Sequence, residues 1–370
     1  MPSFKELGIT NKLVKGLNEF DIHTPTEVQE LAIPFLVETG TDFVCRAQTG
    51  TGKTAAFGLP LLQRINPKSD KVQALVLVPT RELAKQVAKH LFKYTKYTEK
   101  IFTEAVYGGD KIGIQVKALE RRTHIIVATP GRLIDLLKLN AVDLSTVKRV
   151  ILDEADEMLS MGFRDNLGQI LDRIPGRESM WLFSATIPDG IQKLVKRYMS
   201  HDAKHLLLES KDILQDAISH QFIRCPIEDK PERIVEFLER HEGERGLIFC
   251  RSKAGAVKLG QILNDEGFTN SVLQGDLSQK DREKIMRAFR KERIQYLVST
   301  DVAGRGIDIE GLSFVIHHQL PEQTETYIHR SGRTARAGRT GISLALIAGR
   351  DGQRMKKLEQ ELNIRFQQIA

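Results

Sequence analysis

The sequence lacks most of the features that mark secreted, membrane-spanning or metal-binding proteins. Its three cysteines, Cys45, Cys225 and Cys250, are odd in number and far apart. This favours buried, inert thiols in a reducing cytoplasm, because a metal site would need ligand pairs that are absent. No run of about eighteen apolar residues occurs, which excludes a membrane span. The first residues contain no basic segment followed by an apolar run, so we expect a cytoplasmic protein rather than a secreted one.

Aromatic residues are scarce as well. They make up 6% of the chain, and no aromatic cluster predicts a platform for base stacking. Low-complexity tails, Arg/Gly-rich arms and short repeats are absent. Positive charge is present instead: the formal net charge is +7, which suits a polyanionic partner but also an ordinary basic surface. The 370 residues suit two domains of typical size.

Short apolar runs that end in polar clusters organise the first half of the chain. Stretches with helical spacing separate them, as at residues 82–94. We predict strands at residues 42–46, 74–78, 124–127, 149–152 and 180–183. Continuous apolar strands that alternate with helices predict a parallel sheet covered on both faces. Ligands of such sheets bind beyond the carboxyl ends of the strands, which is where the polar clusters fall.

The same pattern restarts in the second half. Predicted strands at 246–250, 271–273, 295–298, 314–317 and 342–347 alternate with predicted helices at 254–264 and 279–290. The predicted fold class is therefore α/β, with two doubly wound parallel-sheet domains in tandem. Both periodicities break within residues 205–217. We accordingly predict a first domain of residues 1–208, a linker of residues 209–217 and a second domain of residues 218–370.

A candidate phosphate-binding loop follows the first predicted strand. Its sequence is Gln48-Thr49-Gly50-Thr51-Gly52-Lys53-Thr54. The two glycines let backbone N–H groups surround phosphate oxygens at a helix N-terminus. Lys53 would pair with the β- and γ-phosphates, and the Thr54 hydroxyl would ligate Mg²⁺. A plain glycine turn before a helix is the simpler interpretation, but it would not need Lys-Thr at that spacing. Ala47 stands where the general pattern has its first glycine.

Two acids at the end of another predicted strand complete a site for nucleotide hydrolysis. Asp153 and Glu154 follow the apolar run at 150–152. Asp153 would hold Mg²⁺, partly through water, and Glu154 would act as general base on the attacking water. Acids also favour a helix start, so this pair alone leaves both interpretations open. Together with the phosphate-binding loop, it predicts hydrolysis of ATP or GTP.

Asp153-Glu154-Ala155-Asp156 spells DEAD, and here the sequence strongly resembles the DEAD-box ATP-dependent RNA helicases of helicase superfamily two. The other motifs stand in family order: TPTEVQ (24–29), AQTGTGKT (47–54), PTREL (79–83), GG (108–109), TPGR (129–132), SAT (184–186), QGD (274–276), TDVAGRGID (300–308) and HRSGRTARAG (329–338). The resemblance covers about residues 4–338. It implies two RecA-like domains, ATP with Mg²⁺ bound between them, and RNA as the partner of a bacterial-type, core-only, monomeric enzyme.

By this resemblance, further residues of the first domain bind the nucleotide. Gln29 would recognise the adenine edge, and an upstream aromatic, Phe20 or Phe4, would pack on the ring. A glutamine amide donates and accepts at once, which matches adenine and not guanine. The remaining nucleotide contacts implied are Thr24, Gln48, Thr49, Gly50, Thr51, Gly52, Lys53, Thr54 and, for the ribose, Asp308. The 24–29 segment is also a helix cap, and both interpretations can hold together.

The resemblance also assigns the arginines of the last motif. Arg333 and Arg336 match arginine fingers, which stabilise charge on the γ-phosphate in the transition state. A basic patch that only touches nucleic acid remains the alternative. Ser331 replaces the usual apolar residue and Ala335 the usual glycine, which would alter the local backbone if that position needs a positive φ. Ser184 and Thr186 match the residues that couple nucleotide state to RNA grip.

Small residues, hydroxyls and arginines at strand ends suit contact with a phosphodiester backbone. The implied RNA-binding residues are Pro79, Thr80, Arg81, Gly108, Gly109, Thr129, Gly131, Arg132, Arg251, Gly275 and Thr300. Backbone contacts carry no base identity, so we expect sequence-independent binding. Helix caps and turns explain the same residue types without any ligand. The preference for RNA over DNA rests wholly on the resemblance.

The predicted function is RNA-stimulated ATP hydrolysis coupled to local unwinding of RNA duplexes or remodelling of RNA–protein complexes. Three alternatives stay open. One is a DNA-directed translocase of the same superfamily, against which the TPTEVQ and DEAD segments argue. Another is an ATP-gated RNA clamp that does not unwind productively. The third is a nucleotide-binding regulator without catalysis.

Overall fold

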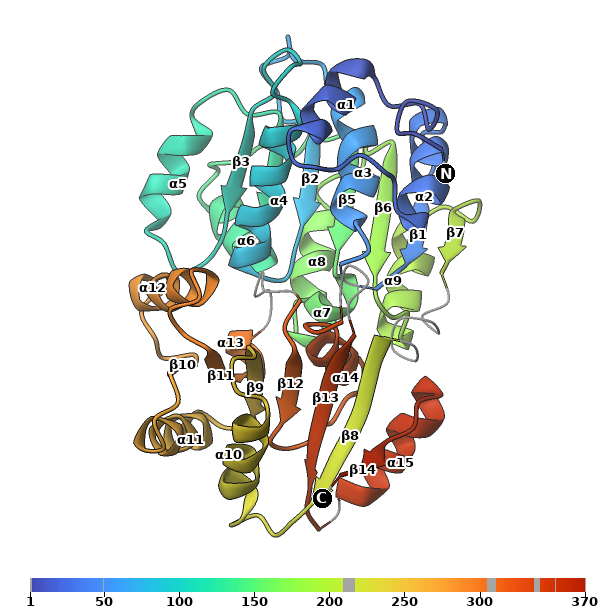
Figure 1. Cartoon of the computed structure of the whole chain (residues 1–370). Coiled ribbons are helices and arrows are strands. Elements are labelled where there is room, and N and C mark those ends of the chain that lie inside the picture. The colour runs from blue at the N-terminus through green and yellow to red at the C-terminus, as the bar shows by residue number, and fades with distance from the viewer. Residues whose placement is uncertain are drawn as a thin grey trace. The chain divides into compact units, whose positions relative to one another are not determined.

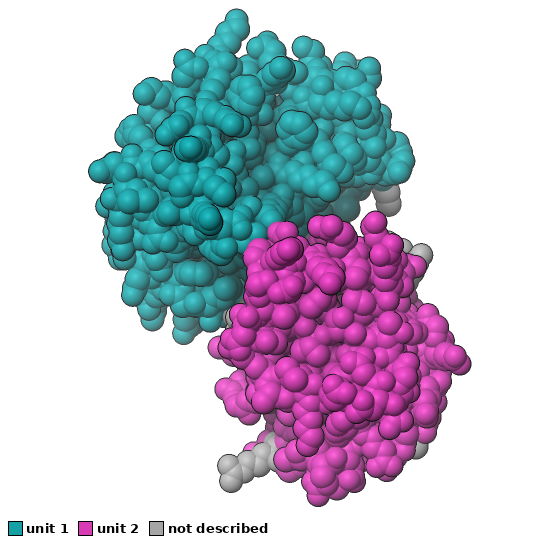
Figure 2. Space-filling view, turned by 90° about the vertical axis from the view of Figure 1, so that its left-hand side faces the viewer, with its two compact units in different colours: residues 1–209 teal, residues 210–370 magenta. Residues whose placement is uncertain are grey.

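A computed structural model describes residues 2–48, 50–208, 217–304, 311–335, 340–349 and 351–369. Contacts divide the chain into two compact units, residues 1–209 and residues 210–370 (Figure 2). Residues 209–216 of the predicted linker lie outside the described residues. In the described part of the chain, no helix is long and apolar enough to cross a membrane. All three cysteines are free and buried, as expected.

Within the described residues, unit 1 is built on one parallel sheet of seven strands (Figure 1). The strands are β1 (Phe43–Arg46), β2 (Ala74–Leu77), β3 (Thr103–Val106), β4 (Ile125–Ala128), β5 (Arg149–Asp153), β6 (Ser179–Ser184) and β7 (Lys204–Leu207). Their order across the sheet is β3-β4-β2-β5-β6-β1-β7. The five predicted strands are all present, and their ends shift by at most one residue.

Helices on both faces bury the sheet of unit 1. They are α1 (Asn11–Asn18), α2 (Glu27–Glu38), α3 (Lys53–Gln63), α4 (Arg81–Tyr94), α5 (Ile112–Leu119), α6 (Pro130–Lys138), α7 (Ala155–Ser160), α8 (Arg164–Leu171) and α9 (Asp189–Tyr198). Alternate side chains of one strand enter separate cores, because successive residues point to opposite faces. Leu75 of β2 belongs to the core beneath α6 and α8, whereas Val76 belongs to the core beneath α3 and α4.

Unit 2 repeats this architecture with a second parallel sheet, again of seven strands among the described residues. The strands are β8 (Ile218–Arg224), β9 (Gly246–Cys250), β10 (Asn270–Leu273), β11 (Tyr296–Thr300), β12 (Phe314–His317), β13 (Gly341–Ile347) and β14 (Gln367–Gln368). The helices are α10 (Lys230–Arg240), α11 (Lys253–Asp265), α12 (Gln279–Arg290), α13 (Asp301–Gly304), α14 (Thr324–Ser331) and α15 (Asp351–Leu362). The strand order is β10-β11-β9-β12-β13-β8-β14. The predicted fold class is therefore confirmed.

Sequence patterns missed β3, β7, β8 and β14, each of which lies at or next to the edge of its sheet. β3 and β7 flank the sheet of unit 1, where a strand needs no continuous apolar run. β7 overlaps the stretch at 205–217 in which both periodicities break, yet its backbone pairs with β1 over its whole length. Its side chains are largely exposed. The apolar periodicity is therefore too weak to predict this strand.

Candidate functional site

The parallel sheet of unit 1 brings the predicted motifs to one edge. β1, β2, β4, β5 and β6 all run in the same direction, so their carboxyl ends meet. The register pairs Arg46 at the end of β1 with Ser184 at the end of β6. Asp153 at the end of β5 pairs with Phe183. The phosphate-binding loop, the DEAD segment and the SAT segment therefore leave neighbouring strands at the same level.

The phosphate-binding loop has the backbone that its glycines predict. Gly50 and Gly52 have φ of 81° and 89°, in the left-handed region that favours glycine. α3 begins directly after Gly52, at Lys53. The Lys53 side chain is buried, and its Nζ donates to the Ala47 carbonyl at 3.0 Å. The lysine ammonium is thus held inside the loop by a hydrogen bond to an uncharged carbonyl. Thr49 lies outside the described residues.

The predicted adenine-reading residue is tied to this loop. Gln29 is buried; its amide Nε2 donates to the Gly52 carbonyl at 3.0 Å, and its Oε1 accepts from the Thr26 N–H at 3.0 Å. Thr26 in turn donates its hydroxyl to the Thr51 carbonyl at 2.7 Å. A Cβ on Gly52 would lie 2.3 Å from Gln29 Nε2, so only glycine fits there. The start of α2 and the phosphate-binding loop therefore form one hydrogen-bonded assembly.

The two phenylalanines predicted to pack on adenine contact other residues of unit 1. Phe4 is buried in the core of unit 1. Phe20 is half-buried beneath Lys93, whose Nζ lies 4.0 Å from the ring centroid. Both phenylalanines are therefore engaged within unit 1. Thr24 is exposed.

The DEAD segment combines a buried acid with a strained backbone. Asp153 is 3% exposed, and its Oδ1 accepts the Glu154 N–H at 3.0 Å. Burial raises the pKa of Asp153 to about 7, although the positive charge of Lys53 acts against this. Glu154 has φ 52° and ψ 51°, a left-handed conformation that is costly for a residue with a Cβ. Such strain is typical of functional positions.

Asp156 joins the DEAD segment to the SAT segment. Its Oδ2 accepts both the backbone N–H and the hydroxyl of Thr186, each at 2.8 Å. Its own N–H donates to Ser184 Oγ at 3.1 Å. The structure therefore brings both predicted coupling residues onto Asp156, Thr186 through the carboxylate and Ser184 through the backbone N–H. Sequence analysis did not assign Asp156 a role, because nothing in the local pattern says which of the neighbouring acids turns inward.

The three predicted RNA-binding segments of unit 1 meet at Asp110. Arg81 Nη1 lies 2.9 Å from Asp110 Oδ1, and Arg132 Nη2 donates to the Asp110 carbonyl at 2.9 Å. A Cβ on Gly109, which has φ 91°, would lie 2.8 Å from Arg81 Nη1. Thr80 caps α4 by accepting the Leu83 N–H at 3.3 Å. Asp110 was not predicted; it follows Gly108-Gly109 directly, which is the only sequence signal for it.

The other predicted residues of these segments lie beside this cluster. Pro79 is buried between β2 and α4, and Gly108 is exposed. Thr129 is the residue before α6, and Gly131 lies in its first turn. The structure thus assembles the predicted RNA-binding residues of unit 1 around the starts of α4 and α6. Helix N-termini carry N–H groups that suit phosphate oxygens.

In unit 2 the predicted RNA-binding residues follow three neighbouring strands. Arg251 comes after β9, Gly275 after β10, and Thr300 ends β11. These strands are adjacent in the order β10-β11-β9. The Arg251 side chain pairs with Glu322, and both side chains are exposed. The three residues therefore share the carboxyl edge of the second sheet.

A buried polar network surrounds Arg330, which belongs to the motif at residues 329–338. Arg330 donates to both carboxylate oxygens of Asp301, at 2.6 and 2.7 Å, and its Nη1 lies 3.3 Å from His317 Nδ1. An arginine only donates, so His317 Nδ1 accepts and its proton sits on Nε2. Nε2 faces the hydroxyls of Ser343 at 3.1 Å and Ser331 at 3.3 Å. Ser331, the departure from the family pattern, is thus a member of this network.

The arginine-finger positions are only partly described. Arg333 is buried and follows α14 in a turn. Arg336 and the predicted ribose contact Asp308 lie outside the described residues. Ala335 has φ 55°, so this position does adopt the left-handed backbone that favours glycine. The alanine that replaces the family's glycine is therefore strained.

No group of three or more His, Cys, Asp or Glu residues that could bind a metal occurs in the described part of the chain. Mg²⁺ does not require such a cluster, because it is commonly held by one or two carboxylates together with substrate phosphates. The buried Asp153 carboxylate and the Thr54 hydroxyl in the first turn of α3 fit that donor set.

Comparisons with known proteins agree with this geometry. Residues 26–194 match the DEAD/DEAH box helicase family, and residues 229–338 match the helicase conserved C-terminal domain. The chain is 38% identical over 369 residues to the ATP-dependent RNA helicase CshA of Listeria monocytogenes, covering 100% of this chain and 70% of that protein. It is 37% identical over 358 residues to CshA of Bacillus subtilis, covering 97% and 72%.

Solved structures give the same result. The fold matches S. cerevisiae Dbp5 bound to RNA and ADP BeF3 with a TM-score of 0.91 and 31% identity, covering 100% of this chain and 96% of that one. It matches Mss116p bound to ssRNA and AMP-PNP with a TM-score of 0.86 and 29% identity, covering 99% and 78%. With the motifs assembled on two RecA-like sheets and these relatives alongside, the chain belongs to the DEAD-box ATP-dependent RNA helicases.

Proposed function

We propose that this helicase couples ATP hydrolysis in unit 1 to its grip on RNA, and that it separates short RNA duplexes locally and without regard to base sequence. The observation that carries the proposal is the Asp156 carboxylate, which binds Thr186 through two hydrogen bonds of 2.8 Å. A change in the DEAD segment during hydrolysis thereby reaches the segment after β6. This is a direct mechanical link between the hydrolytic acids and the predicted coupling residues.

The nucleotide would replace contacts that the phosphate-binding loop makes with itself. Lys53 would exchange the Ala47 carbonyl for the β- and γ-phosphates, a stronger, charge-assisted interaction. Gln29 would hydrogen-bond adenine from the start of α2. Because Gln29 is also hydrogen-bonded to Gly52, binding of the base would affect the phosphate-binding loop. Backbone N–H groups beside Gly50 would bind phosphate oxygens. Asp308 would contact the ribose.

Mg²⁺ would be held by Thr54 and Asp153 together with the phosphates of ATP. When bound, it would neutralise charge that develops on the transferred phosphoryl group. A cation beside Asp153 favours the carboxylate form, which burial otherwise disfavours. Glu154 would accept a proton from the attacking water, and Arg333 and Arg336 would stabilise the charge on the γ-phosphate.

The relatives support RNA as the nucleic-acid substrate, because Dbp5 and Mss116p have been solved with RNA bound. The cluster of Arg81, Asp110 and Arg132 offers backbone N–H groups and guanidinium groups to phosphates. Neither kind of contact reads a base. We therefore propose sequence-independent binding to the RNA backbone, with 2′-hydroxyl contacts as the source of any discrimination against DNA.

The decisive experiment measures RNA-stimulated ATPase and unwinding of a tailed short duplex in parallel, for the wild type and Glu154→Gln. Unwinding with turnover in the wild type, and loss of both in the variant, is the expected result. The exposed Glu120→Gln on unit 1 is the matched control and should behave as wild type. Turnover without strand separation would support the ATP-gated clamp instead. Equal stimulation by DNA and RNA would favour a DNA-directed translocase, and absence of turnover would favour a regulator.

A further inference from the structure

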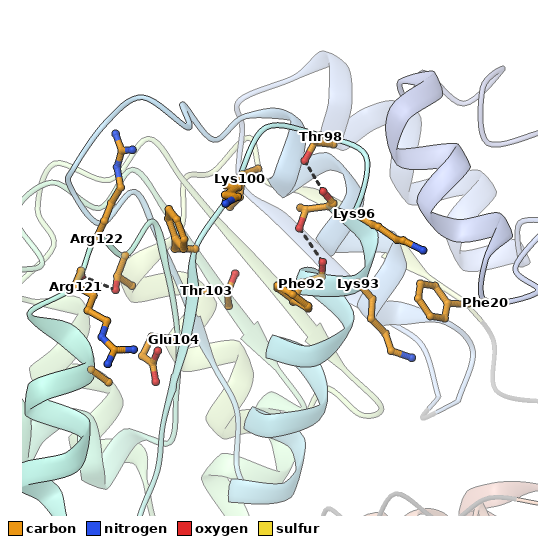
Figure 3. A pocket seen from close by; sticks show the side chains of 15 residues that line it. Phe20, Phe92, Lys93, Lys96, Thr98, Lys100, Thr103, Glu104, Arg121 and Arg122 are labelled. Atoms are coloured by element: carbon orange, nitrogen blue, oxygen red, sulfur yellow. Dashed lines mark hydrogen bonds between the residues drawn. The ribbon is translucent and has the colours of Figure 1, made fainter.

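Unit 1 contains a pocket of about 900 Å³. It lies at the end of α4 and the start of β3, which is the opposite end of both elements from the carboxyl edge of the sheet. Its lining residues come from the end of α4, the start of β3, the end of α5 and the residue Phe20. Figure 3 shows these side chains pointing from their separate segments. β3 runs from Thr103 to Val106, so Gly108-Gly109 follow its other end. The pocket is therefore distinct from the phosphate-binding loop and from the predicted RNA-binding residues, although its lining includes Phe20, one of the two aromatics predicted to pack on adenine.

Three phenylalanines that are distant in sequence line this pocket. Phe92 is 71% exposed and Phe102 is 42% exposed, whereas Phe20 lies under Lys93. Exposed aromatic rings that gather in one pocket form an apolar patch, and such patches mark interaction sites. Sequence analysis predicted no aromatic platform, because these rings come from three separate segments. The fold brings them together.

The charged lining is predominantly basic. It consists of Lys93, Lys96, Lys100, Arg121, Arg122 and Glu104. Lys96 pairs with Glu19, and Arg122 pairs with Asp70 at 2.7 Å. Lys100, by contrast, is exposed and has no carboxylate partner among the residues that the structure describes. Positive charge therefore remains at the rim after the internal ion pairs have formed.

A row of cations on α4 connects the predicted RNA grip to the pocket. Arg81, Lys85, Lys89 and Lys93 recur at every fourth position of the helix. Residues four apart are offset by only ~40° around the helix, so these side chains form one stripe that winds about a third of a turn around α4. The first two also cover the Tyr107 ring, at 4.7 and 5.2 Å from its centroid. Like charges at this spacing destabilise a helix, so an arrangement of this kind favours a polyanionic partner.

We propose that a single strand of RNA continues from the grip at Arg81 along this stripe and enters the pocket. Its phosphates would follow Lys89, Lys93 and Lys100. Its bases would stack on Phe92 and Phe102, which is how single-strand binding surfaces combine charge with aromatic rings. This proposal rests on the proposed function, because it extends the same RNA strand.

The dimensions suit a strand of a few nucleotides. α4 has 14 residues, and at 1.5 Å per residue it spans roughly 20 Å. About six stacked nucleotides cover that length at ~3.4 Å each. One cation about every 6 Å along the helix offers a regular array to a polymer with regular charge. An acidic peptide would also meet positive charge, but it would not need the continuity with Arg81.

The test compares two fluorescein-labelled oligouridylates, U8 and U20, by anisotropy on the full chain with a non-hydrolysable ATP analogue. Phe92→Ala and the double variant Lys93→Glu/Lys100→Glu should weaken U20 binding about tenfold. Binding of U8, and ATPase stimulated by U8, should stay at the wild-type level. For the double variant, the salt dependence of U20 binding should fall by about 0.7 per lost phosphate contact.

Matched controls separate the surface from the substitution itself. Leu139→Ala removes another exposed apolar side chain, and Lys193→Glu reverses another exposed helical lysine. Both should bind U20 as the wild type does. Arg81→Ala should weaken U8 and U20 alike, because it lies in the predicted grip.

Two outcomes would overturn the proposal while leaving the proposed function intact. In the first, U8 binds and stimulates the wild type, but the ratio of U20 to U8 affinity is unchanged in the pocket variants. In the second, a Glu-rich peptide with one phenylalanine binds the wild type and not the double variant, and U20 is unaffected; the surface would then belong to an acidic protein segment. Failure of U8 to bind or stimulate the wild type would instead refute the proposed function.

Discussion

Replacing Asp153 with asparagine should make the protein more stable at pH 8 in the absence of nucleotide and divalent cations. The reason is the burial of its carboxyl group, whose pKa is raised to about 7 from an ordinary 3.8. At pH 8 the folded protein must carry this carboxylate as a buried charge, and Lys53 offsets only part of the cost. Asparagine keeps the side-chain oxygen that accepts the Glu154 N–H, but it carries no charge.

The size of the effect follows from proton linkage. A folded-state pKa above the unfolded value means that the folded state binds more protons between pH 4 and pH 7, so stability falls as the pH rises through 7. At about 1.36 kcal/mol per pKa unit, the gap between 3.8 and about 7 corresponds to ~4 kcal/mol at pH 8. At pH 5 the Asp153 carboxyl is ionised in the unfolded chain but protonated in the folded protein. The destabilisation that this carboxyl causes is then only ~2 kcal/mol.

The assay is thermal or urea unfolding in EDTA at pH 5 and pH 8. The stability advantage of Asp153→Asn should widen by ~2–3 kcal/mol between the two pH values. Asp202→Asn, at an exposed carboxyl in the same unit, is the control and should show little difference at either pH. A variant less stable than the wild type at pH 8, or an advantage that does not change with pH, would refute the reasoning. The variant should also lose ATPase activity, since function and stability conflict at such sites.

Three further outcomes follow from individual contacts. Thr186→Val removes one of the two hydrogen bonds to Asp156 and should lower duplex unwinding more than ATP hydrolysis, as parallel assays would show. Ala335→Gly should raise stability by ~1 kcal/mol because it relieves a left-handed backbone, whereas the control Ala288→Gly in α12 should lower it by a similar amount; calorimetry that finds the same sign for both would contradict this. Ser331→Ala should cost ~1 kcal/mol in thermal unfolding by removing a member of the buried network, and Ser331→Thr should recover part of it.

Sequence patterns predicted the parts of the site whose chemistry is contiguous in the chain. The phosphate-binding loop needs its residues in a fixed order on one turn, so Gly50, Gly52 and Lys53 are recognisable together. Buried strands such as β9 and β12 were predicted with their observed ends, because a central parallel strand is apolar on both faces.

The remainder depends on contacts between residues that are distant in sequence. Asp156 meets Thr186 thirty positions later, and no local pattern predicts that pairing. The row on α4 looks like an ordinary solvated helix face until the fold places Phe102 and Phe20 beside its end. Edge strands such as β7 have exposed side chains, so they lack the apolar periodicity on which prediction relies.

The buried thiols of the three cysteines make the protein convenient for fluorescence work. Burial raises the pKa of Cys45 and of Cys250 to about 12, so neither forms the thiolate that reacts with maleimide dyes at neutral pH. A cysteine introduced at exposed Lys138 in unit 1 and another at exposed Lys258 in unit 2 should therefore label selectively in the native background. Energy transfer between the two dyes would then test whether ATP and RNA together change the separation of the two units.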